Sequence, residues 1–363
     1  MRETTIVVDA LSVHFGGGLS FLTRQLAALG SIAGDRRLRV LSAPWNHEAI
    51  WQATGVEPEL IPVRGVGSRI AYEQLVLSRG SGRQVLYCPG NLIPLGPSRP
   101  PVVLALQNPN LVGAGAREAH NRGPNRRVQI AITRRSARLA DRVVVISNAL
   151  RDQVDEDGLA GMDRLRVIPS GCPELVGGAE ATEPDGFPFA PMEYFLILAN
   201  DAPHKRHDEM VAAWSRAFAG RSDAPGLVIA GEMAQPRRSR QRALAAPGLR
   251  SQLVHTGQVR DRSAVSWLLR NARALVAMST LEAHPLTPAE AGQAGCPLVL
   301  SDIPAHREVA GAHATYVGTE DLDGLGAALR QLARSSPRAP WTWPVTWQDN
   351  AGMLLDVIDE VAP

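Results

Sequence analysis

The sequence predicts an α/β protein of two Rossmann-like domains that face a central cleft. The chain has 363 residues, which exceeds the roughly 100–200 residues of an ordinary domain. Short apolar runs alternate with segments of helical periodicity in both halves, as parallel sheets with crossover helices require. Between the halves, residues 177–191 are rich in glycine, proline and acidic residues and show no period. We therefore expect domains at 1–176 and 192–340, a linker at 177–191, and a closing segment at 341–363.

The first domain opens with a β-branched run at residues 5–10, followed by a glycine turn and a helix. The turn, Gly16-Gly17-Gly18, fits neither the dinucleotide fingerprint G-x-G-x-x-G nor a P-loop, because no Gly-Lys-Ser/Thr follows. Alone it is a weak signal, which a plain turn explains better than a ligand-binding loop. The helix is predicted by apolar residues at helical spacing, and further strands by apolar runs at 38–44, 85–90 and 102–110. The helical residues are Leu19, Leu22, Leu26 and Leu29.

Residues 125–141 form a candidate helix that is strongly basic. Its apolar stripe is thin, with only Val128, Ile132 and Leu139. Such a helix can be a solvated surface helix, or it can lie on an anionic membrane or hold an anionic acceptor, and the sequence leaves these alternatives open. After the next strand, Ser147 is placed to cap a helix. The basic residues are Arg126, Arg127, Arg134, Arg135 and Arg138.

The second domain repeats the alternation, with strands predicted at 194–200, 226–232, 253–259, 272–278 and 296–302. Between its last two strands, a loop enters a helix near Thr287-Pro288, where proline is tolerated. Glu282 lies in this loop and Glu290 is expected in the first helical turn, so both carboxylates can face a crevice above the strand ends. The helix start presents free N–H groups to the same crevice, which suits a phosphate.

Composition excludes several classes of protein. A formal charge of +2 argues against a dedicated nucleic-acid binder. Cys88, Cys172 and Cys296 form no disulfide or zinc pattern, and no apolar run has the length of a signal peptide or membrane span, so we expect a cytoplasmic protein. His204 and His207 are three residues apart but lack a third ligand at useful spacing, so no metal is expected.

The stretch 278–311 resembles the E-x7-E signature of the family 4 retaining glycosyltransferases, which have the GT-B fold. One departure is Ala283, which stands where that family has glycine. A second is Asn200, which replaces an arginine near the donor diphosphate. At the C-terminus, Trp347 and Ala351 resemble the W-x-x-x-A helix that returns to the first domain in this family. The matching residues are Ser279, Glu282, Pro285, Glu290-Ala291, Gly295-Cys296-Pro297, Ser301-Asp302-Ile303-Pro304 and His306-Arg307-Glu308.

This resemblance implies roles for individual residues. Glu290 would bind the ribose hydroxyls of a nucleotide sugar, and Glu282 the hydroxyls of its sugar. Lys205 and the N–H groups around Gly17-Gly18 would take up the charge of the leaving diphosphate, and Asn108 would contact the donor sugar or acceptor, unless it only forms the Asn-Pro turn. Neither a metal nor another cofactor is implied. The remaining donor-binding residues would be Val259, Arg206, Pro285, Leu286 and Thr287.

The implied activity is transfer of a hexose-type sugar from a nucleotide sugar to an acceptor hydroxyl with retention of configuration. A surface polysaccharide, a glycolipid or a secondary metabolite would all fit as product, and the base can be that of UDP, GDP, ADP or TDP. Three rival functions remain: a glycoside hydrolase that uses the two carboxylates, a nucleotide-sugar-binding protein without activity, and a nucleotide-sugar epimerase of the same fold.

Overall fold

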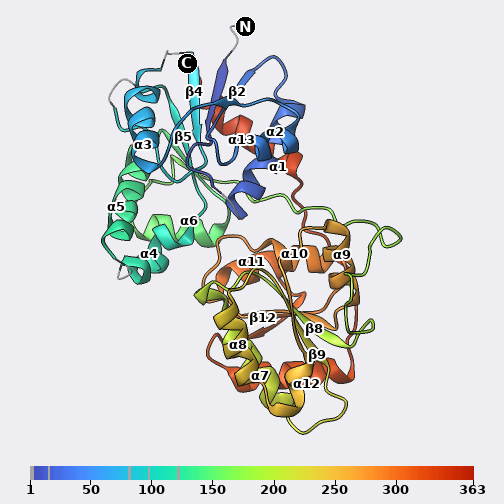
Figure 1. The fold of residues 1–363 in the computed structure, drawn as a ribbon. Coiled ribbons are helices and arrows are strands. Elements are labelled where there is room, and N and C mark those ends of the chain that lie inside the picture. The colour runs from blue at the N-terminus through green and yellow to red at the C-terminus, as the bar shows by residue number, and fades with distance from the viewer. Residues whose placement is uncertain (1–3, 15–16, 81–82, 97–98, 121–122) are drawn as a thin grey trace. The chain divides into compact units, whose positions relative to one another are not determined.

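The computed structural model describes residues 4–14, 17–80, 83–96, 99–120 and 123–363 (Figure 1). It divides into two compact units, Met1–Gly171 with Val345–Pro363, and Cys172–Pro344. Each unit contains one parallel sheet flanked by helices, so the predicted α/β class with two Rossmann-like domains is confirmed. Every helix among the described residues is too short or too polar to span a lipid bilayer.

The sheet of the first unit has seven parallel strands in the order β3-β2-β1-β4-β5-β6-β7. Because β1 pairs with both β2 and β4, the strand order reverses there, and ligands bind at such a reversal in open α/β sheets. The predicted apolar runs form the interior strands, whereas the edge strands β3 and β7 have only two and three residues. The strands are β1 (Thr5–Asp9), β2 (Arg37–Ser42), β3 (Glu59–Leu60), β4 (Gln84–Cys88), β5 (Val102–Leu106), β6 (Arg142–Val145) and β7 (Leu165–Val167).

The predicted leucine stripe of the first helix packs against this sheet, with Leu22, Leu26 and Leu29 buried. The last helix of the chain packs beside it, and Gln25 Nε2 donates to Asn350 Oδ1 over 2.8 Å. Ser147 accepts the N–H of Leu150, so the predicted cap is confirmed. The helices of this unit are α1 (Gly17–Ile32), α2 (His47–Thr54), α3 (Val66–Leu75), α4 (Gly113–His120), α5 (Pro124–Leu139), α6 (Asn148–Glu156) and α13 (Trp347–Asp359), with 3-10 turns η1 (Leu77–Arg79) and η2 (Pro109–Leu111).

The second unit has six parallel strands in the order β10-β9-β8-β11-β12-β13. Alternate residues of β8 enter two separate cores, so both faces of the sheet are covered there and β8 is apolar throughout. The strands are β8 (Tyr194–Leu198), β9 (Gly226–Ala230), β10 (Leu253–Gly257), β11 (Ala274–Ala277), β12 (Leu298–Ser301) and β13 (Ala314–Val317). The helices are α7 (His207–Phe218), α8 (Gln235–Leu244), α9 (Arg262–Asn271), α10 (Leu286–Gln293), α11 (Pro304–Ala310) and α12 (Leu322–Arg334), with η3 (Pro203–Lys205) and η4 (Pro247–Gln252).

Residues 177–191 contain no helix or strand, but part of this segment packs into the second unit. Phe187 makes edge contacts with Tyr194 and Trp267, at centroid distances of 5.0 and 5.3 Å. Phe189 lies against Tyr194 as well. The first stretch of the first unit ends at Gly171 and the second unit begins at Cys172, so the whole of residues 177–191 belongs to the second unit.

Candidate functional site

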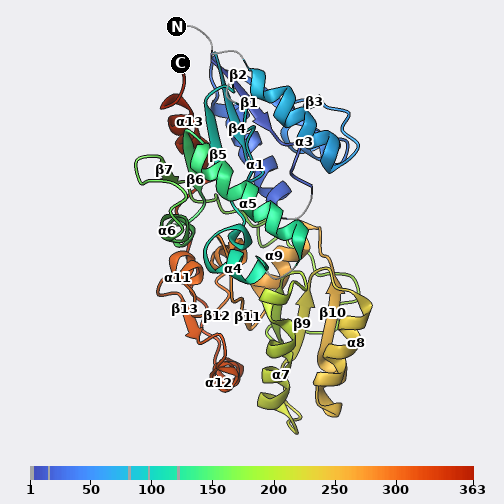
Figure 2. The same ribbon diagram turned by 90° about the vertical axis from the view of Figure 1, so that its left-hand side faces the viewer.

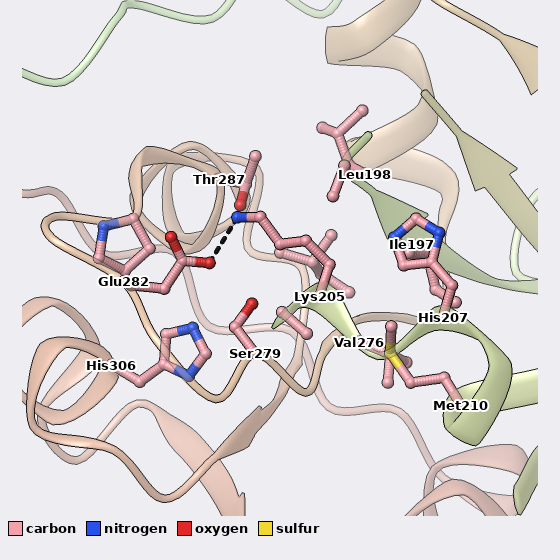
Figure 3. Close-up of a pocket in the computed structure, with 14 residues that line it drawn as sticks. Ile197, Leu198, Lys205, His207, Met210, Val276, Ser279, Glu282, Thr287 and His306 are labelled. Atoms are coloured by element: carbon pink, nitrogen blue, oxygen red, sulfur yellow. Dashed lines mark hydrogen bonds and ion pairs between the residues drawn. The ribbon is translucent and has the colours of Figure 1, made fainter. Parts of the chain in front are cut away.

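Two charged side chains meet at the carboxyl edge of the second sheet. Lys205 ends η3, just before α7, and Glu282 lies in the loop between β11 and α10. Lys205 Nζ donates to Glu282 Oε1 over 2.5 Å (Figure 3). The two side chains are 23% and 13% exposed, so the pair is largely shielded from water but open on one side. Both groups were predicted from the sequence, and the structure brings them together across 77 residues.

A small cavity of about 20 Å³ lies beside this ion pair. That volume is enough for a water molecule, which needs roughly 10–15 Å³ by this kind of measure. Its wall near the ion pair includes Ser279, Pro285 and Thr287, and the apolar part includes Met210 and residues of β8 and β11 (Figure 3). The loop that precedes α10 and the first turn of that helix thus both line one small space.

The environment of Glu282 favours its ionised form. Burial by itself raises the pKa of this carboxyl group, but the ammonium of Lys205 and hydrogen bonds from Lys205 and Ser279 lower it further than burial raises it. The net pKa lies below the ordinary value of 4.5. Glu282 is therefore a carboxylate near neutral pH and acts as a hydrogen-bond acceptor, not as a proton donor.

Two buried histidines line the same cavity. His306 Nδ1 lies 3.0 Å from the carbonyl oxygen of Ser301, which can only accept, so Nδ1 carries a proton. The Ser301 hydroxyl donates to the carbonyl of Ser279 over 2.5 Å and so joins the end of β12 to the loop that carries Glu282. Burial lowers the pKa of His306, and it lowers the pKa of His207 to about 4, so both rings are neutral at physiological pH. From the sequence, His207 was considered only as a possible metal ligand with His204, and no pattern indicated that it lines a cavity.

Glu290 lies away from this cavity, although the sequence predicts that both glutamates face one crevice. Because α10 begins at Leu286, Glu290 opens its second turn, so the expectation of the first turn is wrong. Its side chain is 7% exposed, and its Oε1 lies 2.9 Å from Arg262 Nη2 at the start of α9. Sequence reasoning missed Arg262, since nothing in its spacing relates it to a glutamate 28 residues later.

Several other predicted residues lie elsewhere in the second unit. Arg206 binds the carboxylates of Glu320 and Glu209, so its charge is matched outside the cavity. Val259 packs on the core between the sheet and α9. Leu286 starts α10, next to the cavity residues Pro285 and Thr287.

The remaining predicted residues belong to the first unit. Gly17 and Gly18 are exposed at the first turn of α1, and a Cβ added at either position would meet no atom within 4 Å, while Gly16 lies outside the described residues. Asn108 Oδ1 accepts the N–H of Asn110 over 3.0 Å and caps η2. That contact is the turn-forming role which the sequence left open. Among the described residues, no three His, Cys, Asp or Glu side chains lie close enough together to hold a metal ion.

Residues 193–335 match the family described as "Glycosyl transferases group 1". The match lies within the second unit, which therefore belongs to that family. The match covers the sheet of the second unit, the Lys205–Glu282 pair and the Glu290–Arg262 pair, so the resemblance stated from residues 278–311 is confirmed.

Solved structures agree with this group 1 assignment in fold. The Anabaena protein Alr3699/HepE in complex with UDP-glucose has a TM-score of 0.69 at 13% identity, with 99% of this chain and 98% of that chain covered. WaaG, a glycosyltransferase involved in lipopolysaccharide biosynthesis, has a TM-score of 0.66 at 17% identity, with 98% of each chain covered. At these identities the likeness concerns the fold alone, and it is the two-domain GT-B type.

Among curated sequences, this chain is 25% identical over 174 residues to the serotype-specific mannosyltransferase WbdA of Escherichia coli. That alignment covers 47% of this chain and 21% of the relative. A second WbdA sequence aligns over 56% of this chain and 25% of its own length. The chain thus spans no more than about a quarter of the length of these curated relatives.

Proposed function

We propose that this protein is a metal-independent, retaining glycosyltransferase that moves a hexose-type sugar from a nucleotide sugar to an acceptor hydroxyl. The observation that carries the proposal is the Lys205–Glu282 pair, which stands beside a cavity where a parallel sheet ends and α10 begins. Membership of the group 1 family supports the reaction class.

The chemistry of transfer suits this arrangement. Departure of a nucleoside diphosphate leaves negative charge, which a fixed ammonium and free backbone N–H groups can stabilise without reorganisation. Lys205 supplies the ammonium, and the first turn of α10, at Leu286 and Thr287, supplies N–H groups that have no partner within the helix. In the proposed complex, Lys205 turns from Glu282 to the diphosphate, and the Glu282 carboxylate then accepts hydrogen bonds from the sugar hydroxyls.

Glu290 is the proposed ribose contact. Its contact with Arg262 holds the carboxylate in a nearly buried position, and a carboxylate has the two oxygens needed to accept hydrogen bonds from two adjacent hydroxyl groups. Gly17, Gly18 and Asn108 remain proposed contacts from the first unit, and Val259 and Arg206 from the second.

The acceptor and product are proposed more broadly. One similar protein is named a serotype-specific mannosyltransferase, and another is described as involved in lipopolysaccharide biosynthesis. These names favour a surface polysaccharide or a glycolipid as the product. A secondary-metabolite glycoside is the other product class. The proposal places the protein in the cytoplasm, and it includes contact of residues 125–141 with the inner face of a membrane. Three free cysteines support a reducing compartment.

Calorimetric binding of UDP-, GDP-, ADP- and TDP-sugars to the full chain tests the proposal. We expect one base to be preferred. For that base, Glu290→Gln should weaken the binding of the nucleoside diphosphate and of the nucleotide sugar alike. We expect a loss of roughly 10–100-fold in affinity, because a charged hydrogen-bond acceptor is removed. Glu282→Gln should weaken only the binding of the nucleotide sugar and leave that of the nucleoside diphosphate unchanged. Arg334→Gln, which removes an exposed arginine on α12, serves as control.

Turnover separates the rival functions. Sugar transfer that requires an added acceptor supports the transferase. Release of sugar from a simple glycoside would indicate a hydrolase, conversion of the donor without an acceptor would indicate an epimerase, and tight binding without any turnover would indicate a binding protein. If no nucleotide sugar binds, or if all variants bind like the wild type, the proposed site is wrong.

A further inference from the structure

Between α12 and α13 the chain passes through residues 335–346, which contain no helix or strand (Figure 2). The part of this stretch up to Pro344 belongs to the second unit. We call residues 338–343 the return segment, because the chain enters the first unit again shortly after them. Since an irregular segment has no helix or sheet to fix its backbone, its contacts with neighbouring elements define its position.

The return segment lies along α10 and runs in the opposite direction. Arg338 donates to the carbonyl of Ala294, which directly follows α10, over 3.0 Å. Three residues later, the N–H of Trp341 donates to the carbonyl of Gly292 over 3.0 Å. The indole ring lies against Gly292, where a Cβ atom would overlap it. The return segment thus leads from the C-terminal end of α10 toward its N-terminal end.

The last residue of the return segment, Trp343, contacts the loop that carries Glu282. Its ring and that of His284 pack edge-to-face, with centroids 5.0 Å apart and an angle of 65° between the planes. His284 lies two residues after Glu282 and two before Leu286, where α10 begins. Ala283 and His284 are 8% and 9% exposed, so this part of the loop is buried. The return segment therefore supports both α10 and the loop that precedes it.

Packing holds the His284 ring in place. Within the described part of the chain, neither of its ring nitrogens has a hydrogen-bond partner, although buried polar groups usually have one. Burial lowers the pKa of His284 to about 4, so the ring is neutral at physiological pH. The aromatic contact with Trp343 thus fixes this ring without a hydrogen bond and without a charge.

We propose that Trp343 is a positioning residue, which acts through His284 to hold the Glu282 carboxylate in place. The inference rests on the proposed function, in which Glu282 accepts hydrogen bonds from the donor sugar. In the structure Lys205 holds this carboxylate, but in the proposed complex Lys205 turns to the diphosphate. Glu282 then depends on its own loop for support. A displacement of about 1 Å in such a group can cost up to roughly 100-fold in rate.

The geometry separates this role from the support of α10. Arg338 and Trp341 contact α10 and its C-terminal end, and both contacts remain when Trp343 is replaced. The N–H groups in the first turn of α10, which are proposed to bind the diphosphate, should therefore stay in place. Loss of the Trp343 ring should affect recognition of the sugar and spare recognition of the diphosphate.

Calorimetric binding to the full chain tests the proposal. Trp343→Ala and His284→Ala should each weaken the binding of the nucleotide sugar on the order of tenfold and leave that of the nucleoside diphosphate unchanged. The double variant should bind the nucleotide sugar no more weakly than either single variant, because both changes remove the same contact. A lower melting temperature with an unchanged ratio of the two affinities would show a structural role only, and would overturn the proposal.

Conservative variants show whether the ring or its nitrogens matter. Trp343→Phe and His284→Phe keep an aromatic contact, so both should bind the nucleotide sugar nearly as the wild type does. If His284→Phe loses as much affinity as His284→Ala, the imidazole nitrogens bind the donor directly and the proposal is wrong. The matched control is His313→Ala, because His313 stacks on Trp341 of the same segment at 5.0 Å but does not line the cavity beside Glu282. An equal loss in this control would mean that any change along the segment disturbs the site, and would refute the specific role of Trp343.

Hydrogen exchange of the full chain without ligand gives a second readout. In Trp343→Ala, peptides that cover residues 282–287 should exchange on the order of tenfold faster, whereas those from the C-terminal half of α10 should be unchanged. Unchanged exchange of the loop would overturn the proposal even if the affinity for the nucleotide sugar falls. This measurement needs no donor. If the wild type binds no nucleotide sugar, the proposed function fails, and exchange still decides whether Trp343 holds the loop.

Discussion

Replacing Lys205 by methionine should destabilise the second unit in a pH-dependent manner. The change keeps the side-chain length but leaves Glu282, 13% exposed, without the ammonium that lies 2.5 Å from its Oε1. At an effective dielectric constant near 20, two charges at that distance attract by about 7 kcal/mol, most of which offsets the cost of burying them. Loss of one partner from a buried pair costs about 3–5 kcal/mol, and because Lys205 is 23% exposed we expect about 2–4 kcal/mol near neutral pH.

The sign of the pH dependence follows from the pKa of Glu282. In the wild type this pKa lies below the ordinary 4.5, so ionisation of Glu282 stabilises the folded state above that pH, and the contribution is lost on acidification. In Lys205→Met, the raising effect of burial is opposed mainly by Ser279 and His306. At acidic pH the carboxyl group of Glu282 then becomes protonated, which removes the cost of burying an unpaired negative charge. The difference between variant and wild type should therefore be large near pH 7 and small near pH 4.

Urea unfolding of the full chain at both pH values, with hydrogen exchange of β8 and β11 to report on the second unit, measures this effect. The double variant Lys205→Met with Glu282→Gln should recover at least half of the lost stability, because it removes the unpaired charge. Arg334→Gln, with its exposed guanidinium, should change little. A loss that is equal at both pH values, or a double variant as unstable as the single one, would refute the reasoning.

Three further predictions concern stability. Arg338 donates to the carbonyls of Ala272, Leu269 and Ala294, so Arg338→Met should cost about 2–4 kcal/mol in thermal unfolding, and a loss below the resolution of the assay would contradict this. A Cβ at Gly292 would overlap the ring of Trp341, so Gly292→Ala should cost about 1–3 kcal/mol, whereas Gly352→Ala, with nothing within 4 Å, should stabilise α13 by about 0.5–1 kcal/mol. Burial raises the pKa of Glu73, so its ionisation destabilises the fold progressively from about pH 4.5 upward. Glu73→Gln should raise the melting temperature above neutral pH more than near pH 5, and the opposite order would refute the sign.

Much of the fold was predictable because a buried parallel strand appears in the sequence as a short continuous run of apolar residues. A strand covered on both faces, such as β5 with all five residues buried, must be apolar throughout, and the sequence displays that run directly. Edge strands are different. β3 has two residues, both exposed, so no hydrophobic pattern marks it. The glycine-rich segment was recognised as irregular, but its phenylalanines pack into the second unit, because two aromatic side chains suffice to tie an irregular chain to a core.

The candidate site shows a similar division. Local chemistry marked Glu282 and Lys205 individually, since each follows a strand and precedes a helix in the chain, where open sheets bind ligands. Their hydrogen bond, the neutral state of His306 and the approach of Arg262 to Glu290 depend on side chains far apart in sequence. No periodicity relates such pairs, so only the packed structure could supply them.

The sequence by itself determined the class of the fold, the strands that build each core and the family resemblance of residues 278–311, because hydrophobic period and local motif are properties of short segments. Tertiary structure decided which charges meet. It separated Glu290 from the cavity that Glu282 lines, and it turned the charged side of α3 inward and its valine and leucine side chains outward. Burial and ion pairing are set by neighbours from other elements, and these are fixed only when the sheets and helices have packed.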